Sequence, residues 1–228
     1  MLPIRDDTPR STTPFVNYFL IALNLAVFFF ESTLGPHSRA GFDFQFALIP
    51  RHVESWLSGS LPAGNALLPF LTSMFLHANL WHVGLNMWFL RVFGDNVEDR
   101  LGHFAYIIFY LLCGLGANLT HFVFNFSSQV PALGASGAIA GVMGAYFILY
   151  PRARVLTWWL VFVFWLPAWL VLGYWFIGEF LGGAASLFTA SSGAGGVAVW
   201  AHVGGFVTGV LLIKLLPVRK NVYAFEEY

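Results

Sequence analysis

The sequence predicts an all-α polytopic membrane protein that folds as a bundle of six transmembrane helices. Of its 228 residues, 58% are hydrophobic and only 10% are charged, whereas a soluble domain carries about 25% charged residues. Residues 104–151 contain no Asp, Glu, Lys or Arg. This segment is too long for one crossing of about 20 residues, and the polar stretch SSQVP divides it into two. The chain length and the mean hydropathy of +0.71 accommodate six crossings.

Apolar runs, and the breaks between them, give the order of the helices. The first run has no small-residue cleavage pattern after it, so we expect a retained helix rather than a signal peptide. A long connector follows, from Gly35 to Leu68. The expected helices span about residues 15–34, 69–93, 104–126, 136–150, 167–181 and 199–216.

Two segments between these helices have distinctive compositions. Residues 153–166 are apolar and aromatic, and Pro167 separates them from the fifth helix, because proline interrupts helical hydrogen bonding. We expect them to form a loop at the membrane edge, and we expect no β-sheet anywhere in the chain. Residues 182–197 are rich in Gly and Ser, which predicts a flexible loop.

Lys and Arg set the expected orientation, because they concentrate in cytoplasmic loops. Of the 11 basic residues, only Arg39 and Arg51 fall on the outer side of a six-helix arrangement. Both termini are therefore expected in the cytoplasm. The expected organisation is a cytoplasmic segment at 1–14, a membrane domain at 15–217 and a cytoplasmic tail at 218–228.

Charge and cysteine content exclude other classes of function. The formal net charge is zero, so no basic surface for nucleic acid is expected. The single cysteine, Cys113, cannot form an internal disulfide. Its position in an apolar run predicts a buried, inert thiol.

Polar side chains cluster near the outer ends of the second, fourth and sixth helices. In this topology all three helices start at the outer face, which places five polar residues at similar depth: His77, His82, Asn86, Ser136 and His202. Polar groups in membranes usually face the bundle interior or a wet cavity. A serine becomes a nucleophile when a base such as histidine takes its proton. The pattern therefore predicts acyl-transfer chemistry.

Small residues at four-residue spacing are expected to bring the fourth and sixth helices together, because they let membrane helices approach backbone to backbone. The stripes are Ser136, Ala140 and Gly144; Gly137, Gly141 and Ala145; and Ala201, Gly205 and Gly209. Such contact would place Ser136 beside His202.

Further groups complete the expected site. Backbone N–H groups at a helix start are unpaired, so the N–H of Ser136 is an oxyanion donor. His82 and Asn86 are four residues apart, share one helix face and also donate. No carboxylate on the outer side is close in sequence to His202, so we expect a Ser–His dyad whose imidazole is held by packing. Glu179 is expected to reach toward water at the outer end of the fifth helix, with a part in gating as the alternative.

Three motifs in register carry a resemblance to the rhomboid family of intramembrane serine proteases. They are HANLWHVGLN at 77–86, GASG at 134–137 and AHVGG at 201–205. The FGDNVEDRLG and YPRAR segments resemble bacterial members, so a multi-pass protein of the bacterial inner membrane is expected.

The resemblance implies a role for each site residue. Ser136 is the expected nucleophile and His202 the general base, while His82, Asn86 and the backbone N–H of Ser136 form the oxyanion hole. His77 is expected to shape an outer water-filled pocket. Three glycines are expected to support the site: Gly134, Gly137 and Gly205. The implied substrates are single-span or polytopic membrane proteins, cut near the outer end of a helix without metal or cofactor, and they enter beside the fifth helix.

The chain departs from the family pattern at two places. Many members have Trp-Arg where this chain has Leu68 and Pro69, so another group must anchor the connector. Some members have an aromatic residue where this chain has Ala140, so an aromatic residue elsewhere must pack against His202.

Other readings of the same residues are weaker. A catalytically silent, rhomboid-like scaffold that binds membrane proteins is the main alternative, although both Ser136 and His202 are present. A small transporter would need charges near the membrane midplane, and only Glu179 is available. A metal site formed by His77, His82 and His202 is disfavoured, because residues five apart lie about 140° apart around a helix. The G-x-S-x-G elbow of soluble hydrolases is also rejected for the serine segment, because that motif needs a preceding strand and none is expected here.

Overall fold

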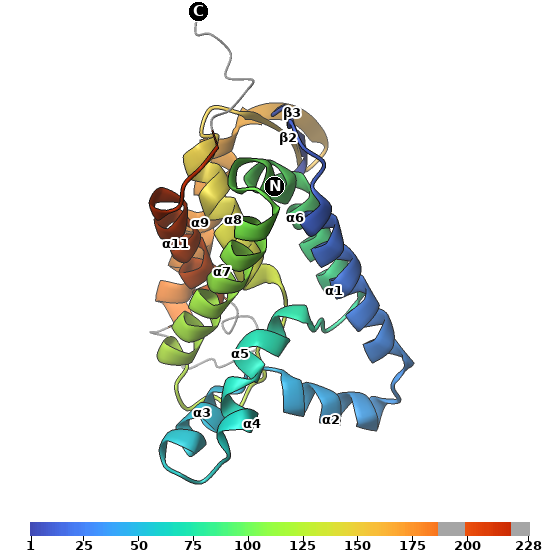
Figure 1. Cartoon of the computed structure of the whole chain (residues 1–228), viewed down its shortest axis with the longest axis vertical. Helices are drawn as coiled ribbons and strands as arrows, with labels where there is room; N and C mark the ends of the chain where they lie inside the picture. Colours follow the sequence, from blue (N-terminus) through green and yellow to red (C-terminus); the bar gives the residue numbers. More distant parts are fainter. Residues whose placement is uncertain (187–198, 220–228) are drawn as a thin grey trace, which may run out of the picture.

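The computed structural model of the protein describes residues 1–186 and 199–219. Long helices form a bundle, with a small β-sheet at one end and a connector of short helices at the other (Figure 1). The central helix is α8, which contacts helices on several sides and buries most of its residues. The long helices are α1 (Phe15–Thr33), α6 (Leu80–Leu101), α7 (His103–Phe124), α8 (Ser136–Leu149), α9 (Ala168–Ser186) and α11 (Val199–Leu215).

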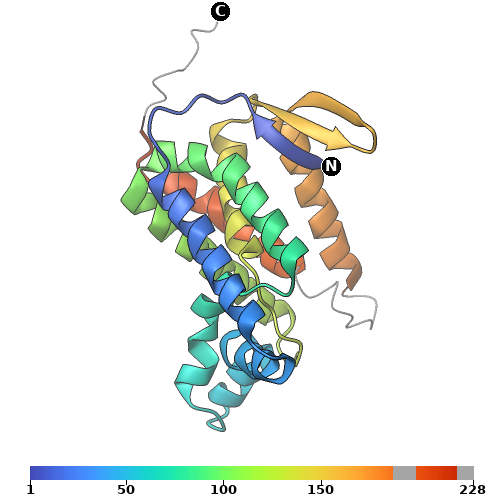
Figure 2. The same ribbon diagram turned by 90° about the vertical axis from the view of Figure 1, so that its right-hand side faces the viewer.

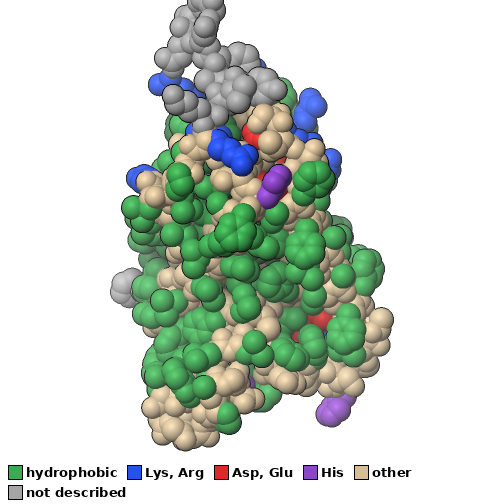
Figure 3. Space-filling view, in the orientation of Figure 1, with side chains coloured by type: hydrophobic (Ala, Val, Ile, Leu, Met, Phe, Trp, Pro, Cys, Tyr) green, Lys and Arg blue, Asp and Glu red, His purple; other side chains and the backbone are tan. Residues whose placement is uncertain are grey.

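The outer surface of the bundle is apolar. Hydrophobic side chains cover most of the face in Figure 3, whereas Lys and Arg gather at the end of the bundle that carries the β-sheet. Helices α1, α7 and α9 are long and apolar enough to cross a membrane, and α8 and α11 are shorter apolar helices. Charged residues near its C-terminal end make α6 less apolar. The six-span count and the cytoplasmic position of both termini therefore stay predictions.

The expectation of one helix over residues 69–93 is wrong. The connector ends in two short pieces, α5 (Pro69–Thr72) and the 3₁₀ turn η1 (Ser73–Phe75), and the backbone is extended at Leu76. Helix α6 starts only after Asn79, whose side-chain oxygen accepts a hydrogen bond from the backbone N–H of His82. Asparagine is a favoured N-cap because it satisfies one of the free donors of a helix start. His77 consequently precedes the helix.

A three-stranded antiparallel sheet contradicts the expected absence of strands. Strands β2 (Arg154–Trp159) and β3 (Phe162–Pro167) form a hairpin in place of the expected loop, and β1 (Leu2–Asp6) pairs with β2. The hairpin is rich in Val, Phe and Trp, which favour strands. Figure 2 shows the sheet covering one end of the bundle. The N-terminal segment is thus packed against the bundle, and the indole N–H of Trp88 donates to the carbonyl oxygen of Pro3 at 2.6 Å.

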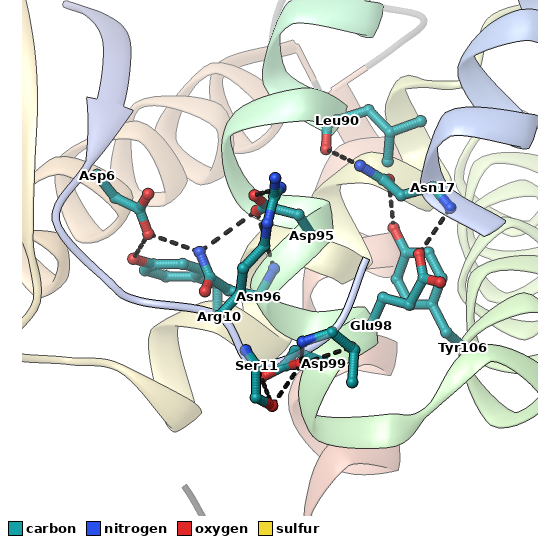
Figure 4. Close-up of polar contacts among 12 residues, drawn as sticks. Asp6, Arg10, Ser11, Asn17, Leu90, Asp95, Asn96, Glu98, Asp99 and Tyr106 are labelled. Carbon is teal, nitrogen blue, oxygen red and sulfur yellow. Dashed lines mark hydrogen bonds and ion pairs between the residues drawn. The ribbon is translucent and has the colours of Figure 1, made fainter. Parts of the chain in front are cut away.

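Acidic residues on the last turns of α6, which continues to Leu101 beyond its expected end, hold the N-terminal segment. Figure 4 shows this network. Asp99 accepts hydrogen bonds from the backbone N–H and hydroxyl groups of both Ser11 and Thr12. Asp95 forms an ion pair with Arg10 at 2.9 Å.

Glu98 caps the first turn of α1. Its two carboxylate oxygens accept the backbone N–H groups of Val16 and Asn17 at 3.0 and 2.7 Å. A carboxylate at a helix start satisfies free donors and complements the helix dipole. The Asn17 amide also donates to the carbonyl oxygen of Leu90, so polar contacts fix α1 against α6.

The connector is anchored without the Trp-Arg pair. It contains α2 (Pro36–Phe46), α3 (Pro50–Leu57) and α4 (Ala63–Leu67). The guanidinium of Arg39 donates to the carbonyl oxygen of His77 at 2.7 Å. Leu48 and Ala132 form an isolated antiparallel bridge to the loop before α8. The connector is therefore tied to the segments that precede both α6 and α8.

The expected close approach of the fourth and sixth helices is confirmed. A Cβ on Gly205 would overlap the carbonyl oxygen of Gly137, and a Cβ on Gly209 would overlap that of Gly141. Only glycine permits this backbone contact between α8 and α11. The contact fixes the relative position of the first turns of the two helices.

Candidate active site

Ser136 and His202 meet across the α8–α11 contact. Ser136 is the first residue of α8, and His202 lies in the first turn of α11 (Val199–Leu215). The Oγ of Ser136 is 2.8 Å from the Nε2 of His202, which is a normal hydrogen-bond distance for a serine nucleophile and its base. The two residues are 66 positions apart in the chain.

The second imidazole nitrogen has a carboxylate partner, which corrects one expectation. The Nδ1 of His202 lies 2.9 Å from the Oε2 of Glu179 on α9. The side chains of His202 and Glu179 are 16% and 23% exposed. The expectation that packing alone holds the imidazole is therefore wrong. Glu179, which was expected to reach toward water, is partly exposed and also contacts His202, because α9 packs against α11.

An aromatic residue packs against His202, as the absence of an aromatic at position 140 requires. The indole of Trp175 lies with its ring centroid 5.8 Å from the imidazole centroid, at an interplanar angle of 39°. Trp175 also belongs to α9 and precedes Glu179 by four residues. One face of α9 therefore carries both contacts to the imidazole.

A cavity of about 290 Å³ opens beside Ser136 and His202. Its wall is mostly apolar, so it suits a peptide segment with hydrophobic side chains. Its lining comes from α6, α8, α9, α11 and the loop before α8: His82, Leu85, Asn86, Phe89, Leu133, Ser136, Ile139, Met143, Trp175 and His202. The two predicted side-chain oxyanion donors, the predicted nucleophile and the predicted base thus face one space.

Asn86 is the most informative polar group in this wall. It is 7% exposed, and its side-chain Nδ2 has no hydrogen-bond partner within the described residues. Buried polar groups are nearly always paired, so an unpaired amide beside a cavity marks a position where a ligand oxygen can accept its hydrogen bond.

Gly134 allows His82 to approach the loop that leads to Ser136. The φ angle of Gly134 is +129°, and a Cβ at this position would lie 2.8 Å from the Nε2 of His82. Any other residue would be strained in this backbone region and would displace the imidazole. The backbone N–H of Gly134 donates to the carbonyl oxygen of Ser73 at 2.9 Å, which holds the loop in place.

A second cavity of about 240 Å³ also borders Ser136. Its lining includes His82 and Ser136, and also Asn118 of α7 and Ala201 of α11. Ser136 therefore borders two spaces.

His77 lies apart from both cavities. It is fully buried, and its ring packs edge-on against His82 with centroids 5.2 Å apart. Its backbone N–H donates to Glu31 at 3.2 Å. Neither of the two cavities has His77 in its wall, so its contact with the site is through His82. Across the described residues, no three His, Cys, Asp or Glu side chains are grouped to hold a metal ion.

Comparison with known proteins places this geometry in a family. A profile described as the rhomboid domain matches residues 64–219. The chain belongs to the rhomboid family. Rhomboid proteins are integral membrane proteins and are generally intramembrane serine proteases.

Several rhomboid relatives are organellar proteins. The chain is 31% identical over 157 residues to Rhomboid protein 1, mitochondrial, of Saccharomyces cerevisiae, which covers 63% of this chain and 40% of the yeast protein. It is 31% identical over 169 residues to RHOMBOID-like protein 6, mitochondrial, of Arabidopsis thaliana, covering 72% and 48%. It is 29% identical over 163 residues to the mouse presenilin-associated rhomboid-like protein, mitochondrial, covering 68% and 40%. The chain thus spans less than half the length of these relatives, and they give no support to a specifically bacterial type.

Proposed function

We propose that this rhomboid protein is an intramembrane serine endopeptidase that cleaves transmembrane helices near the outer membrane face. The observation that carries the proposal is the 2.8 Å contact between Ser136 Oγ and His202 Nε2 beside a cavity. Supporting it are the unpaired amide of Asn86 in the cavity wall and the family membership. The alternative is a rhomboid-like scaffold that binds membrane proteins without cutting them.

The first step is attack by Ser136 on a substrate carbonyl carbon. His202 Nε2 takes the hydroxyl proton as the Oγ–carbon bond forms. The carbonyl oxygen becomes an oxyanion, which the Asn86 amide, the His82 imidazole and the backbone N–H of Ser136 stabilise. One such donor typically contributes about 2.7–4 kcal/mol to transition-state stability.

The second step breaks the peptide bond and then releases the product. The imidazolium of His202 returns its proton to the leaving amine, and the acyl group stays on Ser136. Water then attacks the ester with His202 again as base. The proposed reaction uses only side chains, backbone donors and water.

A helical substrate must unwind locally, because its carbonyls are hydrogen-bonded within the helix. We therefore propose a preference for sites with small or helix-breaking residues. The apolar wall that Leu85, Phe89 and Trp175 form between α6 and α9 suits entry of such a segment from the lipid beside α9.

The proposed topology has six spans from α1, α6, α7, α8, α9 and α11, with both termini in the cytoplasm. The membrane domain is residues 15–217, flanked by segments 1–14 and 218–228. Expectation of a bacterial inner membrane rests on the FGDNVEDRLG and YPRAR segments alone. We therefore propose an integral membrane location without naming the membrane.

Incubation with a panel of single-span membrane proteins in bilayers tests the function. We expect at least one to be cut near the outer end of its helix, with the site read by mass spectrometry, and we expect Ser136→Ala to leave it intact. Stable binding of a substrate protein by the wild type, with no cleavage of any panel member, would favour the scaffold.

A further inference from the structure

The carboxylate of Glu179 is placed to control His202. Its Oε2 lies 2.9 Å from Nδ1, while Ser136 Oγ lies 2.8 Å from Nε2. The imidazole therefore bridges a hydroxyl and a carboxylate through its two opposite nitrogens.

This arrangement determines which nitrogen carries the proton. A carboxylate only accepts hydrogen bonds, so its contact requires a proton on Nδ1 of His202. Neutral histidine has one protonated nitrogen, and Nε2 is then free to accept the proton of Ser136. The carboxylate of Glu179 thus selects the tautomer that a general base needs.

A merely solvated or structural role does not account for the position of Glu179. A carboxylate on a membrane helix is costly unless it pairs or reaches water. Glu179 lies in a helix whose neighbouring residues, Ile177 and Phe180, are exposed on an apolar surface. Its side chain nevertheless turns inward and contacts His202.

The neighbouring contact from α9 strengthens the assignment. Trp175 lies one turn before Glu179 and packs against the imidazole face of His202. The Trp175 contact limits the tilt of the imidazole ring, and the Glu179 contact limits its rotation. Two independent contacts from one helix face therefore fix the imidazole toward Ser136.

We propose that Glu179 is a positioning residue that makes the nucleophilic pair a Ser136–His202–Glu179 triad. The proposal rests on the proposed function. As Ser136 Oγ attacks, its proton moves to Nε2, and the Nδ1 proton stays on His202 while hydrogen-bonded to Glu179. The carboxylate remains ionised and stabilises the imidazolium, which later returns its proton to the leaving amine.

The triad links catalysis to the position of α9. Glu179 and Trp175 belong to the helix that also walls the cavity. Outward displacement of α9 would open the cavity and separate Glu179 from His202.

Glu179→Gln tests the proposal through the rate at which a fluorophosphonate labels the wild-type protein in bilayers. The amide can present its NH₂ group to Nδ1 and stabilise the wrong tautomer. Loss of the buried acid in soluble triads lowers kcat by about 10⁴-fold, and because Glu179 is partly exposed we expect a fall of about 10- to 100-fold in kinact. The inhibitor constant KI should stay unchanged. Glu179→Asp keeps the charge and should restore part of the rate.

The pH profile of labelling separates positioning from a structural defect. The titratable groups facing His202 in the described residues are Glu179 from α9 and His82 from α6, while α8 supplies the hydroxyl of Ser136. Removing the negative charge should change the shape of the pH profile, whereas a structural defect should lower the labelling rate by the same factor at every pH. Glu54→Gln is the matched control, because it removes a carboxylate that pairs with Arg51 far from the site.

A measurement that needs no activity separates this proposal from the proposed function. In protein labelled with ¹⁵N-histidine, the His202 signal, assigned with His202→Gln, should show a protonated Nδ1 in the wild type and a changed tautomer mixture in Glu179→Gln. Unchanged His202 signals would overturn the triad even if the protein cleaves substrates. If the His202 signals change in Glu179→Gln but the wild-type protein reacts with no fluorophosphonate, the Glu179–His202 contact is supported and the proposed function is overturned.

Discussion

Gly205 of α11 lies directly against the carbonyl oxygen of Gly137 of α8. Gly137 directly follows Ser136, and Gly205 lies about one turn after His202, so this backbone contact sets the distance between Ser136 and His202. Because the contact is between main chains, it cannot relax by rotation of a side chain.

Gly205→Ala should therefore lower both activity and stability. The added methyl group overlaps the Gly137 carbonyl and forces the helices apart. Overpacking of this kind costs about 1–3 kcal/mol of stability, and a displacement near 1 Å at a reacting pair lowers rates by about 100-fold. Thermal unfolding and fluorophosphonate labelling measure the two effects. Gly41→Ala is the control, because Gly41 lies on a helix with open space around it. Equal behaviour of the two variants would show that the α8–α11 contact does not set the site.

Asn86→Ala should lower the cleavage rate without lowering stability. The amide Nδ2 has no partner in the described residues, so its removal leaves no other buried group unpaired. If it donates to the oxyanion, the rate should fall by about 100- to 1,000-fold. The comparison variant is Asn118→Ala, whose amide donates to the carbonyl oxygen of Phe70 and to Ser73 Oγ. That variant should lose stability. An Asn86 variant with a full cleavage rate would remove this residue from the oxyanion hole.

Asp6 should make stability depend on pH. Burial raises the pKa of Asp6 above its ordinary value, although hydrogen bonds from Tyr146 and Thr8 oppose the shift. A raised folded-state pKa means that the folded protein binds the proton more tightly than the unfolded chain. The contribution of Asp6 is then fully present below its ordinary pKa and is lost as pH rises through the folded-state pKa.

Melting temperatures measured from the ordinary pKa of 3.8 upward to neutral pH follow this contribution. In Asp6→Asn the corresponding part of the pH dependence should vanish, because the amide does not titrate. Asp7→Asn is the control, since Asp7 forms a more exposed ion pair with Arg154. If melting temperature depended on pH in the same way in the wild type and in Asp6→Asn, Asp6 would not be the cause of this pH dependence.

Periodic features of the chain were predictable from sequence. The apolar runs gave α1, α7, α8, α9 and α11 with boundaries close to those observed. The small-residue stripes indicated the α8–α11 contact, because glycine spacing determines how closely helices approach. The residues that line the cavity beside Ser136 include three of the polar residues singled out in advance: His82, Asn86 and His202.

Features that depend on local capping or tertiary contact were missed. The apolar run over residues 69–93 hides a break, and Asn79 was the available signal for it as an N-cap. Alternating β-branched and aromatic residues in 154–167 were the signal for the hairpin, but its pairing with β1 joins distant parts of the chain. Nothing in the sequence around Glu179 or around His202 predicts that these two side chains are in contact. The spacing of Trp175 and Glu179 on one helix face becomes informative only when α9 is known to face α11. The expected loop at 182–197 lies within α9 up to Ser186, and residues 187–198 lie outside the described residues.

The most direct test of the central claim is to locate the adduct of a fluorophosphonate on the folded protein in bilayers. The account predicts one phosphonylated residue, Ser136, with labelling abolished in His202→Ala and in Ser136→Ala. An adduct on another residue, or full labelling of Ser136 without His202, would contradict the proposal that this hydroxyl and this imidazole form the nucleophilic pair.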